Sequence, residues 1–238
     1  MKQMEVESVL KGNAYPGRGI LIGKSADGTK ACVAYFIMGR SENSRNRIFE
    51  LKDGSLFTAP FDASKVEDPR LIIYRALSSF ENKLIVTNGD QTDTILAGLE
   101  QGIGFQKALE SRCFEPDAPH FTPRISGLLT FENGDFRYEM SILKSIDSEG
   151  SACARYHFSY PVKAGVGHLI HTYQSDGSPL PSFEGEPRAV QIESDIDTFT
   201  RELWQALDDD NKISLFVRFV DLENGESEDR MINKKELL

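Results

Sequence analysis

Cysteine is scarce in this chain of 238 residues. Three are present, Cys32, Cys113 and Cys153, and they are far apart, with no CxxC pair. An odd number of widely spaced cysteines argues against a disulfide framework and does not match the spacing of a cysteine-based zinc site. The pattern therefore predicts a protein of a reducing compartment, the cytoplasm.

Long hydrophobic runs are also missing. The longest apolar run extends from Ala31 to Met38, whereas a membrane-spanning helix needs about 20 apolar residues. The N-terminal residues Met1 to Glu5 lack the apolar segment of a signal peptide. We therefore expect a cytoplasmic protein with no membrane partner.

Positive charge is in short supply. Lys and Arg number 27 against 37 Asp and Glu, which leaves a formal net charge of −10 at pH 7. A chain this acidic repels nucleic-acid backbones, so we predict no nucleic-acid partner, although a local arginine cluster can still bind a small anion. The remaining composition, 39% hydrophobic and 27% charged, is ordinary for a globular protein.

Several catalytic signatures are absent. The sequence contains no Walker loop, no GxGxxG, no GxSxG and no HExxH, which argues against a P-loop nucleoside triphosphatase, a serine hydrolase and a zinc protease. An N-terminal-nucleophile amidase needs Cys, Ser or Thr at residue 2, where this chain has Lys2. His168 and His171, three apart in a glycine-rich stretch, are too few for a zinc motif, so we predict no metal.

The hydrophobic pattern predicts many strands in hairpins and a few helices. We expect strands at 19–23, 31–38, 71–77, 83–87, 125–131, 136–146, 154–160 and 213–220. Helices are expected at 92–101, 105–112 and 197–207, the last capped by Thr198. The stretch 161–187, rich in Gly and Pro, is expected to be a long functional loop, and the polar tail 223–238 a loose segment.

These elements predict an α+β fold in which sheet packs on sheet with helices outside. The near-continuous apolarity of 31–38 indicates a strand buried on both faces, as inside a layered structure. Because no linker or internal repeat divides the chain, we expect one domain over 1–238, with 150–238 as an extension of that domain.

The densest polar cluster follows the expected strand at 31–38. Three arginines and two asparagines lie between Arg40 and Arg47, and guanidinium groups bind phosphate or carboxylate through paired hydrogen bonds. The cluster is typical of an anion clamp, which Arg18 before the first strand can join. A solvated charged loop is the alternative, and composition alone favours it.

Two further segments combine turn residues with polar groups. Asn88–Asp93 joins a strand to a helix N-terminus, where backbone N–H groups bind anions or carbonyls. Alternatively, Thr92 or Asp90 simply caps that helix. The segment 115–124 contains three prolines that fix its path, which suits a loop that presents polar side chains, with an ordinary connection as the alternative.

Five short motifs occur in order between residues 15 and 125: Tyr15-Pro16-Gly17-Arg18-Gly19, Gly39-Arg40-Ser41 with Asn46-Arg47, Ile72-Ile73-Tyr74, Thr87-Asn88-Gly89 with Thr92-Asp93, and Thr122-Pro123-Arg124-Ile125. Together they resemble the archaeal-type inosine monophosphate (IMP) cyclohydrolase family. The loop from Arg40 to Asn46 is longer than expected of archaeal members, and the region after residue 150 extends beyond their pattern.

The resemblance implies a four-layer αββα sandwich related to the N-terminal-nucleophile hydrolase fold, without its nucleophile, in agreement with Lys2. It implies an enzyme of purine biosynthesis, a cyclohydrolase that converts 5-formamido-1-(5-phosphoribosyl)imidazole-4-carboxamide, a small purine-ribonucleotide precursor, into IMP and water. No cofactor is implied. The resemblance also suggests a homo-oligomer.

Residue by residue, the resemblance implies two groups of site residues. Catalysis is assigned to Tyr74, Glu115 and Asn88. Substrate binding is assigned to Arg18, Arg40, Asn46, Arg47, Gly89, Thr92, Asp93, Thr122 and Arg124, with the arginines holding the phosphate.

Two other functions stay open at this point. One is a related purine-ribonucleotide amidohydrolase that acts on another C–N bond. The other is a non-catalytic nucleotide-binding protein that keeps the clamp without the chemistry. The presence of Tyr74, Asn88 and Glu115 together favours an enzyme.

Overall fold

Two antiparallel sheets form the centre of the molecule. The computed structural model describes residues 4–66 and 73–237. In spatial order, the six-stranded sheet consists of β11 (Arg188–Gln191), β10 (Val166–His171), β1 (Arg18–Lys24), β2 (Lys30–Met38), β12 (Lys212–Asp221) and β13 (Ser227–Asn233). The seven-stranded sheet consists of β3 (Arg47–Lys52), β4 (Ser55–Pro60), β5 (Tyr74–Phe80), β6 (Lys83–Thr87), β7 (Arg124–Glu132), β8 (Asp135–Ser145) and β9 (Cys153–Tyr160). Neighbouring strands within each sheet are antiparallel.

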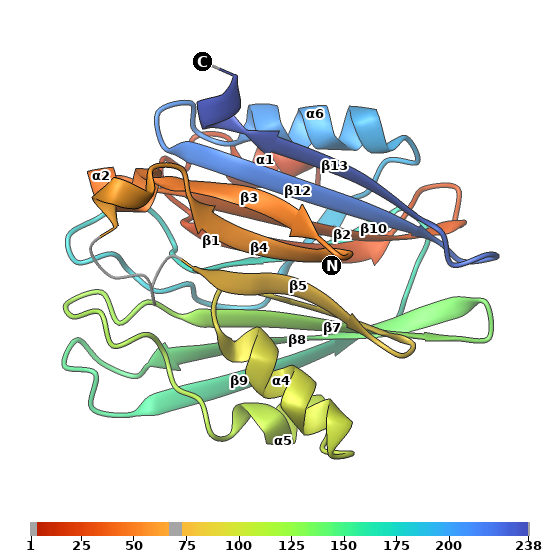
Figure 1. The fold of residues 1–238 in the computed structure, drawn as a ribbon, viewed down its shortest axis with the longest axis horizontal. Helices are drawn as coiled ribbons and strands as arrows, with labels where there is room; N and C mark the ends of the chain where they lie inside the picture. The colour runs from red at the N-terminus through yellow and green to blue at the C-terminus, as the bar shows by residue number, and fades with distance from the viewer. Residues whose placement is uncertain (1–3, 67–72, 238) are drawn as a thin grey trace.

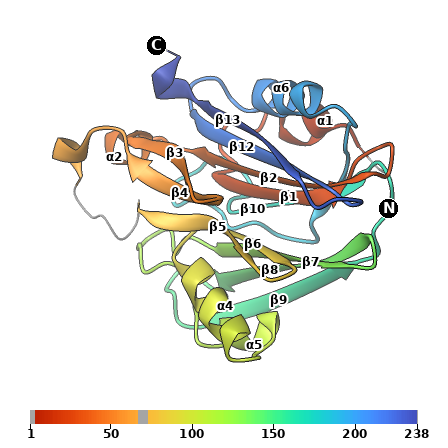
Figure 2. The same cartoon turned by 45° about the vertical axis from the view of Figure 1, so that its right-hand side comes forward.

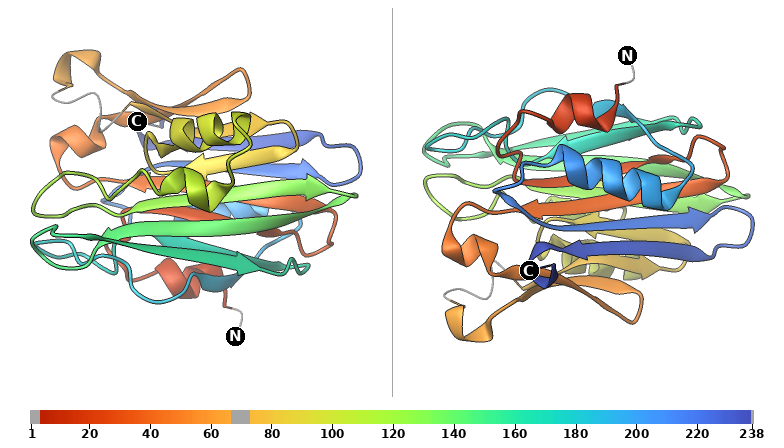
Figure 3. Two further views of the ribbon diagram at one scale, coloured as in Figure 1. Left: turned by 90° about the horizontal axis from the view of Figure 1, so that it is seen from below. Right: turned by 90° about the horizontal axis from the view of Figure 1, so that it is seen from above.

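Helices cover the outer face of each sheet (Figures 1 and 3). On the six-stranded sheet lie α1 (Val6–Leu10) and α6 (Ile196–Ala206), and on the seven-stranded sheet lie α4 (Gln91–Glu100) and α5 (Phe105–Leu109). The turned view separates the two sheets, with one pair of helices above and the other below (Figure 2). The short elements are α2 (Glu42–Arg45) and the 3₁₀ turns η1 (Ala63–Lys65) and η2 (Lys234–Glu236). The expected α+β class is confirmed.

Strand β2 shows why the molecule is layered. Every residue from 31 to 38 is buried, and alternate side chains point to opposite faces of a sheet. Val33 and Tyr35 belong to the core between the two sheets, whereas Cys32 and Phe36 belong to the core beneath α1 and α6. The expectation of a strand buried on both faces is confirmed.

Most elements lie within one residue of their expected bounds. This holds for β1, β2, β6, β7, β8, β9, β12, α4 and α6. Strand β5 begins at Tyr74 and ends at Phe80, three residues after the expected end, and residues 71 and 72 of the expected strand lie outside the described residues. Helix α5 ends at Leu109, three residues before its expected end. Thr198 is not the cap of α6, as expected, because the Asp195 side chain accepts the Thr198 N–H and Asp195 is the N-cap. Among the described residues, no helix has the length and apolar character needed to cross a bilayer.

The stretch 161–187 is not one long loop, because it contains strand β10. This strand pairs with β1 on one side and with β11 on the other. Gly167 has a loop-like sequence signature, yet it lies opposite Gly23 of β1, where the two backbones approach closely. A Cβ atom on Gly23 would lie 2.4 Å from the Gly167 Cα atom, so both glycines serve strand packing.

Two hairpins also differ from the expectation. The polar tail is not loose, because residues 227–233 form β13, an edge strand paired with β12. An edge strand needs few apolar residues, and Ile232 supplies one of them by packing against the core. The hairpin of β3 and β4 was not predicted. It directly follows the arginine cluster, in which Glu42–Arg45 form the short helix α2.

Replacing Gly23 with alanine is expected to lower the free energy of unfolding by about 1–3 kcal/mol or more, the cost of overpacking a core. The new Cβ atom would lie 2.5 Å from the Val166 carbonyl oxygen, a backbone atom held by the pairing of β1 with β10. Urea denaturation followed by circular dichroism measures the loss. The control is Gly104→Ser at the N-cap of α5, which has open space around it and should change stability by less than about 0.5 kcal/mol. Equal stability of Gly23→Ala and wild type would contradict the close approach.

Candidate active site

A cavity of about 290 Å³ lies where β1 and β2 meet the segments 115–122 and 173–180. This volume is at the lower end of the range of small-molecule pockets, roughly 300–1,000 Å³. The folding of distant segments brings five predicted site residues into its wall: Arg18, Arg40, Arg47, Glu115 and Thr122.

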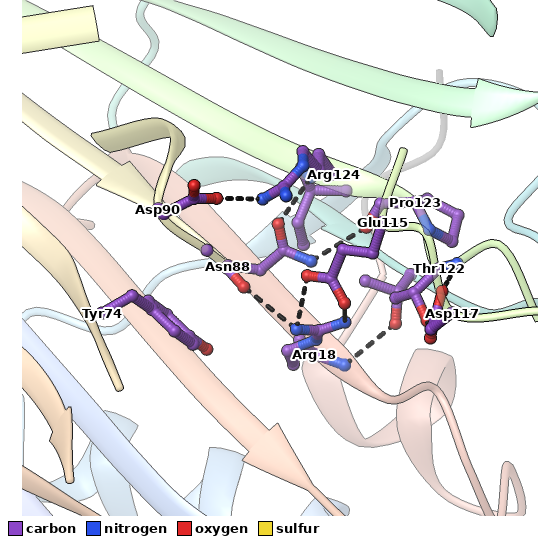
Figure 4. A network of polar contacts seen from close by, with 12 residues as sticks. Arg18, Tyr74, Asn88, Asp90, Glu115, Asp117, Thr122, Pro123 and Arg124 are labelled. Carbon is purple, nitrogen blue, oxygen red and sulfur yellow. Dashed lines mark hydrogen bonds and ion pairs between the residues drawn. The ribbon is translucent and has the colours of Figure 1, made fainter. Parts of the chain in front are cut away.

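A buried ion pair forms part of the cavity wall (Figure 4). Arg18 Nη1 and Nη2 each donate to one oxygen of Glu115 at 3.0 Å, and Nη1 also donates to the Asn88 carbonyl oxygen. The Arg18 and Glu115 side chains are 9% and 7% exposed. Burial opposes the charge of Arg18, but the Glu115 carboxylate and nearby tyrosines outweigh burial and raise the pKa of Arg18 well above its ordinary value. The Arg18 guanidinium therefore stays charged.

Hydrogen bonds fix the segment that carries Glu115. The Glu115 N–H donates to the Thr122 carbonyl oxygen at 2.9 Å. The Asp117 carboxylate accepts the Thr122 N–H at 2.7 Å and the Thr122 hydroxyl. His120 Nδ1 accepts the Leu180 N–H at 3.1 Å. The loop 115–122 is thus held both to itself and to the segment 173–180.

Aromatic rings connect this loop to the arginine cluster. The Tyr173 hydroxyl is hydrogen-bonded to the Thr122 hydroxyl, and burial raises the pKa of Tyr173 above its ordinary value, so the phenol keeps its proton at pH 7. The Tyr173 ring stacks on Tyr15 with 5.8 Å between centroids. The Arg40 guanidinium in turn lies 5.0 Å from the centroid of the Tyr15 ring. Hydroxyl donors and a cation therefore share one wall of the cavity.

The two arginines of the cluster that line the cavity differ in their partners. Arg47 is buried, donates to the carbonyl oxygens of Ser44 at 2.8 Å and Met38 at 2.9 Å, and forms no ion pair within residues 4–66 and 73–237. Arg40 forms an ion pair with Asp176. Because buried charges in proteins are normally neutralised by an opposite charge, this wall suits the anionic group of a ligand.

Tyr74 lies beside the cavity rather than in its wall. It is buried in the core between the sheets, with its hydroxyl directed toward Arg18 (Figure 4). The Tyr74 and Tyr35 hydroxyl oxygens are 2.7 Å apart, and burial, aided by Tyr74, raises the pKa of Tyr35 well above its ordinary value. Of the three residues assigned to catalysis, Glu115 lines the cavity, Asn88 contacts Arg18, and Tyr74 faces Arg18.

The turn at Asn88 and Gly89 supports the wall from behind. The Asn88 amide donates to the Pro123 carbonyl oxygen and accepts the Ile125 N–H, both at 2.9 Å, so it joins the end of β6 to the start of β7. A Cβ atom on Gly89 would lie 2.6 Å from Arg124 Nη1 and 2.7 Å from Gln91 Oε1, so a side chain at this position would displace those two groups. This turn therefore positions the carbonyl oxygen that Arg18 contacts.

The remaining predicted residues contact other parts of the protein. Their partners are Asp90 and Gln91 for Arg124, Thr87 for Thr92, Arg75 for Asp93, and the Asp62 backbone for Asn46. Burial works against the Asp90 charge, yet Arg112 and Arg124 outweigh it and lower the pKa of Asp90. The cavity wall does not include these four predicted residues.

Ten further residues of the wall are missing from the predicted set, among them Tyr15, Asp117, His120, Tyr173 and Leu180. The Gly and Pro content of 161–187 signals a functional segment without indicating which residues matter. Tyr173 reaches the cavity because β10 pairs with β1, with His171 opposite Gly19. No local sequence pattern predicts that pairing.

His168 and His171 of β10 each form a hydrogen bond within the protein. His168 Nδ1 is 2.6 Å from the Tyr138 hydroxyl, and His171 Nδ1 is 2.8 Å from the Tyr173 carbonyl oxygen. Burial lowers the pKa of each to about 4, so both rings are neutral at pH 7. In the described part of the chain, no group of three or more His, Cys, Asp or Glu side chains has an arrangement that could hold a metal ion.

Comparison with known proteins shows the family of this chain. Residues 15–226 match the family described as IMP cyclohydrolase-like protein. This chain belongs to that family. A protein of Methanopyrus kandleri named IMP cyclohydrolase is 33% identical over 181 residues, which cover 71% of this chain and 89% of the relative. A protein of the same name from Methanothrix thermoacetophila is 32% identical over 175 residues, 72% of this chain and 80% of the relative.

The predicted resemblance to the IMP cyclohydrolase family is confirmed. The matched range contains every predicted site residue. It also contains the strands β10, β11 and β12, and hence the segment that supplies Tyr173 to the cavity.

Proposed function

We propose that this protein is an IMP cyclohydrolase, an enzyme that closes the ring of 5-formamido-1-(5-phosphoribosyl)imidazole-4-carboxamide to give IMP and water in purine biosynthesis. Family membership and the names of the two relatives support this activity. The observation that carries the proposal is one cavity whose wall combines Arg40 and Arg47 with the buried pair of Arg18 and Glu115.

The two sets of charged residues in the wall suit the two ends of this substrate: Arg40 and Arg47 suit the phosphate, and the pair of Arg18 and Glu115 suits the imidazole. Guanidinium groups bind phosphate through paired hydrogen bonds, so Arg40 and Arg47 hold the 5′-phosphate. The imidazole, with its carboxamide and formamido groups, then lies toward Arg18, Glu115 and the Thr122 hydroxyl. Binding energy from the phosphate orients the reacting groups at the other end.

The reaction needs one bond formed and one molecule of water lost. The carboxamide nitrogen attacks the formyl carbon and loses a proton, while the formyl oxygen gains one. A second proton reaches that oxygen, water leaves, and the formamido nitrogen loses its proton to form the new C=N bond. Holding the two groups close together supplies much of the acceleration, since the carboxamide nitrogen is a weak nucleophile.

The residues divide this chemistry between them. Arg18 stabilises the negative charge that develops on the formyl oxygen, and the Tyr74 hydroxyl, which faces Arg18 from beside the cavity, holds Arg18 in position. Glu115 carries the protons between nitrogen and oxygen, a role worth about 10²–10⁴-fold in rate. Asn88 positions Arg18 through its carbonyl oxygen. The reaction in this form involves no metal and no organic cofactor.

The wider architecture is part of the same proposal. Two facing sheets with helices outside support an αββα relationship to N-terminal-nucleophile hydrolases. Residues 1–238 form one cyclohydrolase domain in this proposal, and its part after residue 150 adds β10 to β13 to the sheet of β1 and β2. The cytoplasmic location and the homo-oligomer stay predictions.

The test is an assay of the purified protein with the formamido-ribotide, in which ultraviolet absorbance and chromatography follow IMP. We expect IMP to form in proportion to protein, and the same compound without its phosphate to react at least about tenfold more slowly, since it lacks the charge-assisted contacts. Release of formate or ammonia without IMP would indicate the amidohydrolase instead. No product, together with a melting temperature raised by IMP, would indicate a binding protein.

A further inference from the structure

The segment 173–180, here called the strap, crosses one side of the cavity. Its end residues, Tyr173 and Leu180, are buried in the cavity wall, whereas most residues between them are exposed. The Tyr173 N–H donates to the Pro16 carbonyl oxygen at 3.1 Å, and the Gln174 N–H donates to the Pro181 carbonyl oxygen at 2.8 Å. The strap is therefore fixed at its ends and open to solvent at its tip.

The tip of the strap is held by Arg40. The Asp176 carboxylate forms an ion pair with Arg40 Nη1, and the Gly177 carbonyl oxygen accepts from the same nitrogen at 2.9 Å. The side chains of Arg40 and Asp176 are 32% and 50% exposed. One arginine thus belongs both to the cavity wall and to the attachment of an exposed loop.

Asp176 differs from the other acceptors around the cavity arginines. Arg18 faces Glu115, which is buried, and Arg47 faces backbone carbonyl oxygens that cannot leave. Asp176 is half exposed, and an ion pair of that kind contributes little, so its carboxylate can return to water at small cost. A carboxylate and a phosphate oxygen bind a guanidinium in the same way and repel each other, so both cannot occupy Arg40 Nη1 at once.

We propose that Asp176 is an internal competitor for the phosphate group of the ligand, a residue that sets phosphate affinity by occupying Arg40 in the free protein. A bound phosphate displaces the Asp176 carboxylate and frees the tip of the strap. By linkage, the ion pair weakens phosphate binding by the same factor by which phosphate weakens the ion pair. The nucleotide nature of the ligand rests on the proposed function, whereas the competition concerns any ligand that brings a phosphate to Arg40.

Asp176→Asn tests this competition, because it removes the charge and keeps the shape. Isothermal titration at low salt measures Kd for IMP, inorganic phosphate and inosine. We expect IMP and phosphate to bind about two- to fivefold more tightly to the variant, the range that partly exposed ion pairs contribute, with inosine unchanged. In an Arg40→Ala background the same change should have no effect.

Glu184→Gln is the matched control, since Glu184 is an exposed carboxylate just beyond the strap and its loss changes the net charge equally. We expect its Kd values to equal those of the wild type. An equal gain in Glu184→Gln would overturn the proposal by showing a general charge effect. Unchanged or weaker binding in Asp176→Asn, a gain that persists without Arg40, or no binding to any of these proteins would also overturn it.

The outcome is separable from that of the proposed reaction. If the protein forms no IMP from the formamido-ribotide, but Asp176→Asn still binds inorganic phosphate more tightly than wild type, the competition stands and the cyclohydrolase activity is excluded. If the protein forms IMP, and wild type and Asp176→Asn bind phosphate with the same Kd, the cyclohydrolase activity stands and the competition is excluded.

Discussion

Replacing Glu115 with alanine is expected to lower the free energy of unfolding by about 3–5 kcal/mol, the cost of leaving one partner of a buried ion pair uncompensated. Arg18 would stay buried, 9% exposed, without the carboxylate that accepts from both of its Nη atoms. The rate of ring closure should also fall, because the cavity loses both its proton carrier and the carboxylate that orients Arg18. Urea denaturation measures the first effect, and the formamido-ribotide assay measures the second.

Two control proteins separate stability from chemistry. Glu132→Ala removes a carboxylate that is 47% exposed and pairs with Arg137, and it should cost less than about 1 kcal/mol. The double change Arg18→Met with Glu115→Leu replaces the pair by apolar side chains and should recover much of the stability, since such replacements are often neutral. It should remain without activity. A double variant that still closes the ring would contradict the catalytic role of the pair.

Arg40→Ala and Tyr74→Phe are expected to separate binding from turnover. Loss of the Arg40 guanidinium removes a charge-assisted contact to phosphate, worth about 1.5–3 kcal/mol or roughly 10–100-fold in the Kd of IMP. Loss of the Tyr74 hydroxyl leaves the ring in the core and removes a group that holds Arg18 in position beside the developing oxyanion. We expect Kd to stay within about twofold and kcat to fall up to about 10²-fold, the cost of misplacing a group that acts in the transition state.

Tyr138→Phe is the matched control for Tyr74→Phe. Tyr138 is a buried tyrosine of the same inter-sheet core, and its hydroxyl contacts His168 instead of facing Arg18. Its loss should leave kcat unchanged. Equal changes in Kd and kcat from both Arg40→Ala and Tyr74→Phe would count against the division of roles, and a fall in kcat for Tyr138→Phe would show that hydroxyl loss in this core is not specific.

Local apolar patterns account for the elements that were predicted well. The run 31–38 is apolar at nearly every position and is buried on both faces, and Asp27-Gly28 after β1 predicts the hairpin that joins β1 to β2. The motifs around Arg18 and Arg40 also lie within short segments, so the family could be identified without the fold. Two strands with a weak hydrophobic pattern were not predicted, because β10 contains Gly167 and β13 is polar.

The sequence by itself determined the α+β class, most element positions, the family and five residues of the cavity. Only the tertiary structure decided which charges meet, because those contacts depend on sheet order and not on neighbouring residues. Glu115 reaches Arg18 across 97 positions of sequence, and Asp176 reaches Arg40 across 136. Tyr173 enters the cavity through the pairing of β10 with β1. Local propensity carries no information on such pairings, since burial of whole sheet faces selects them.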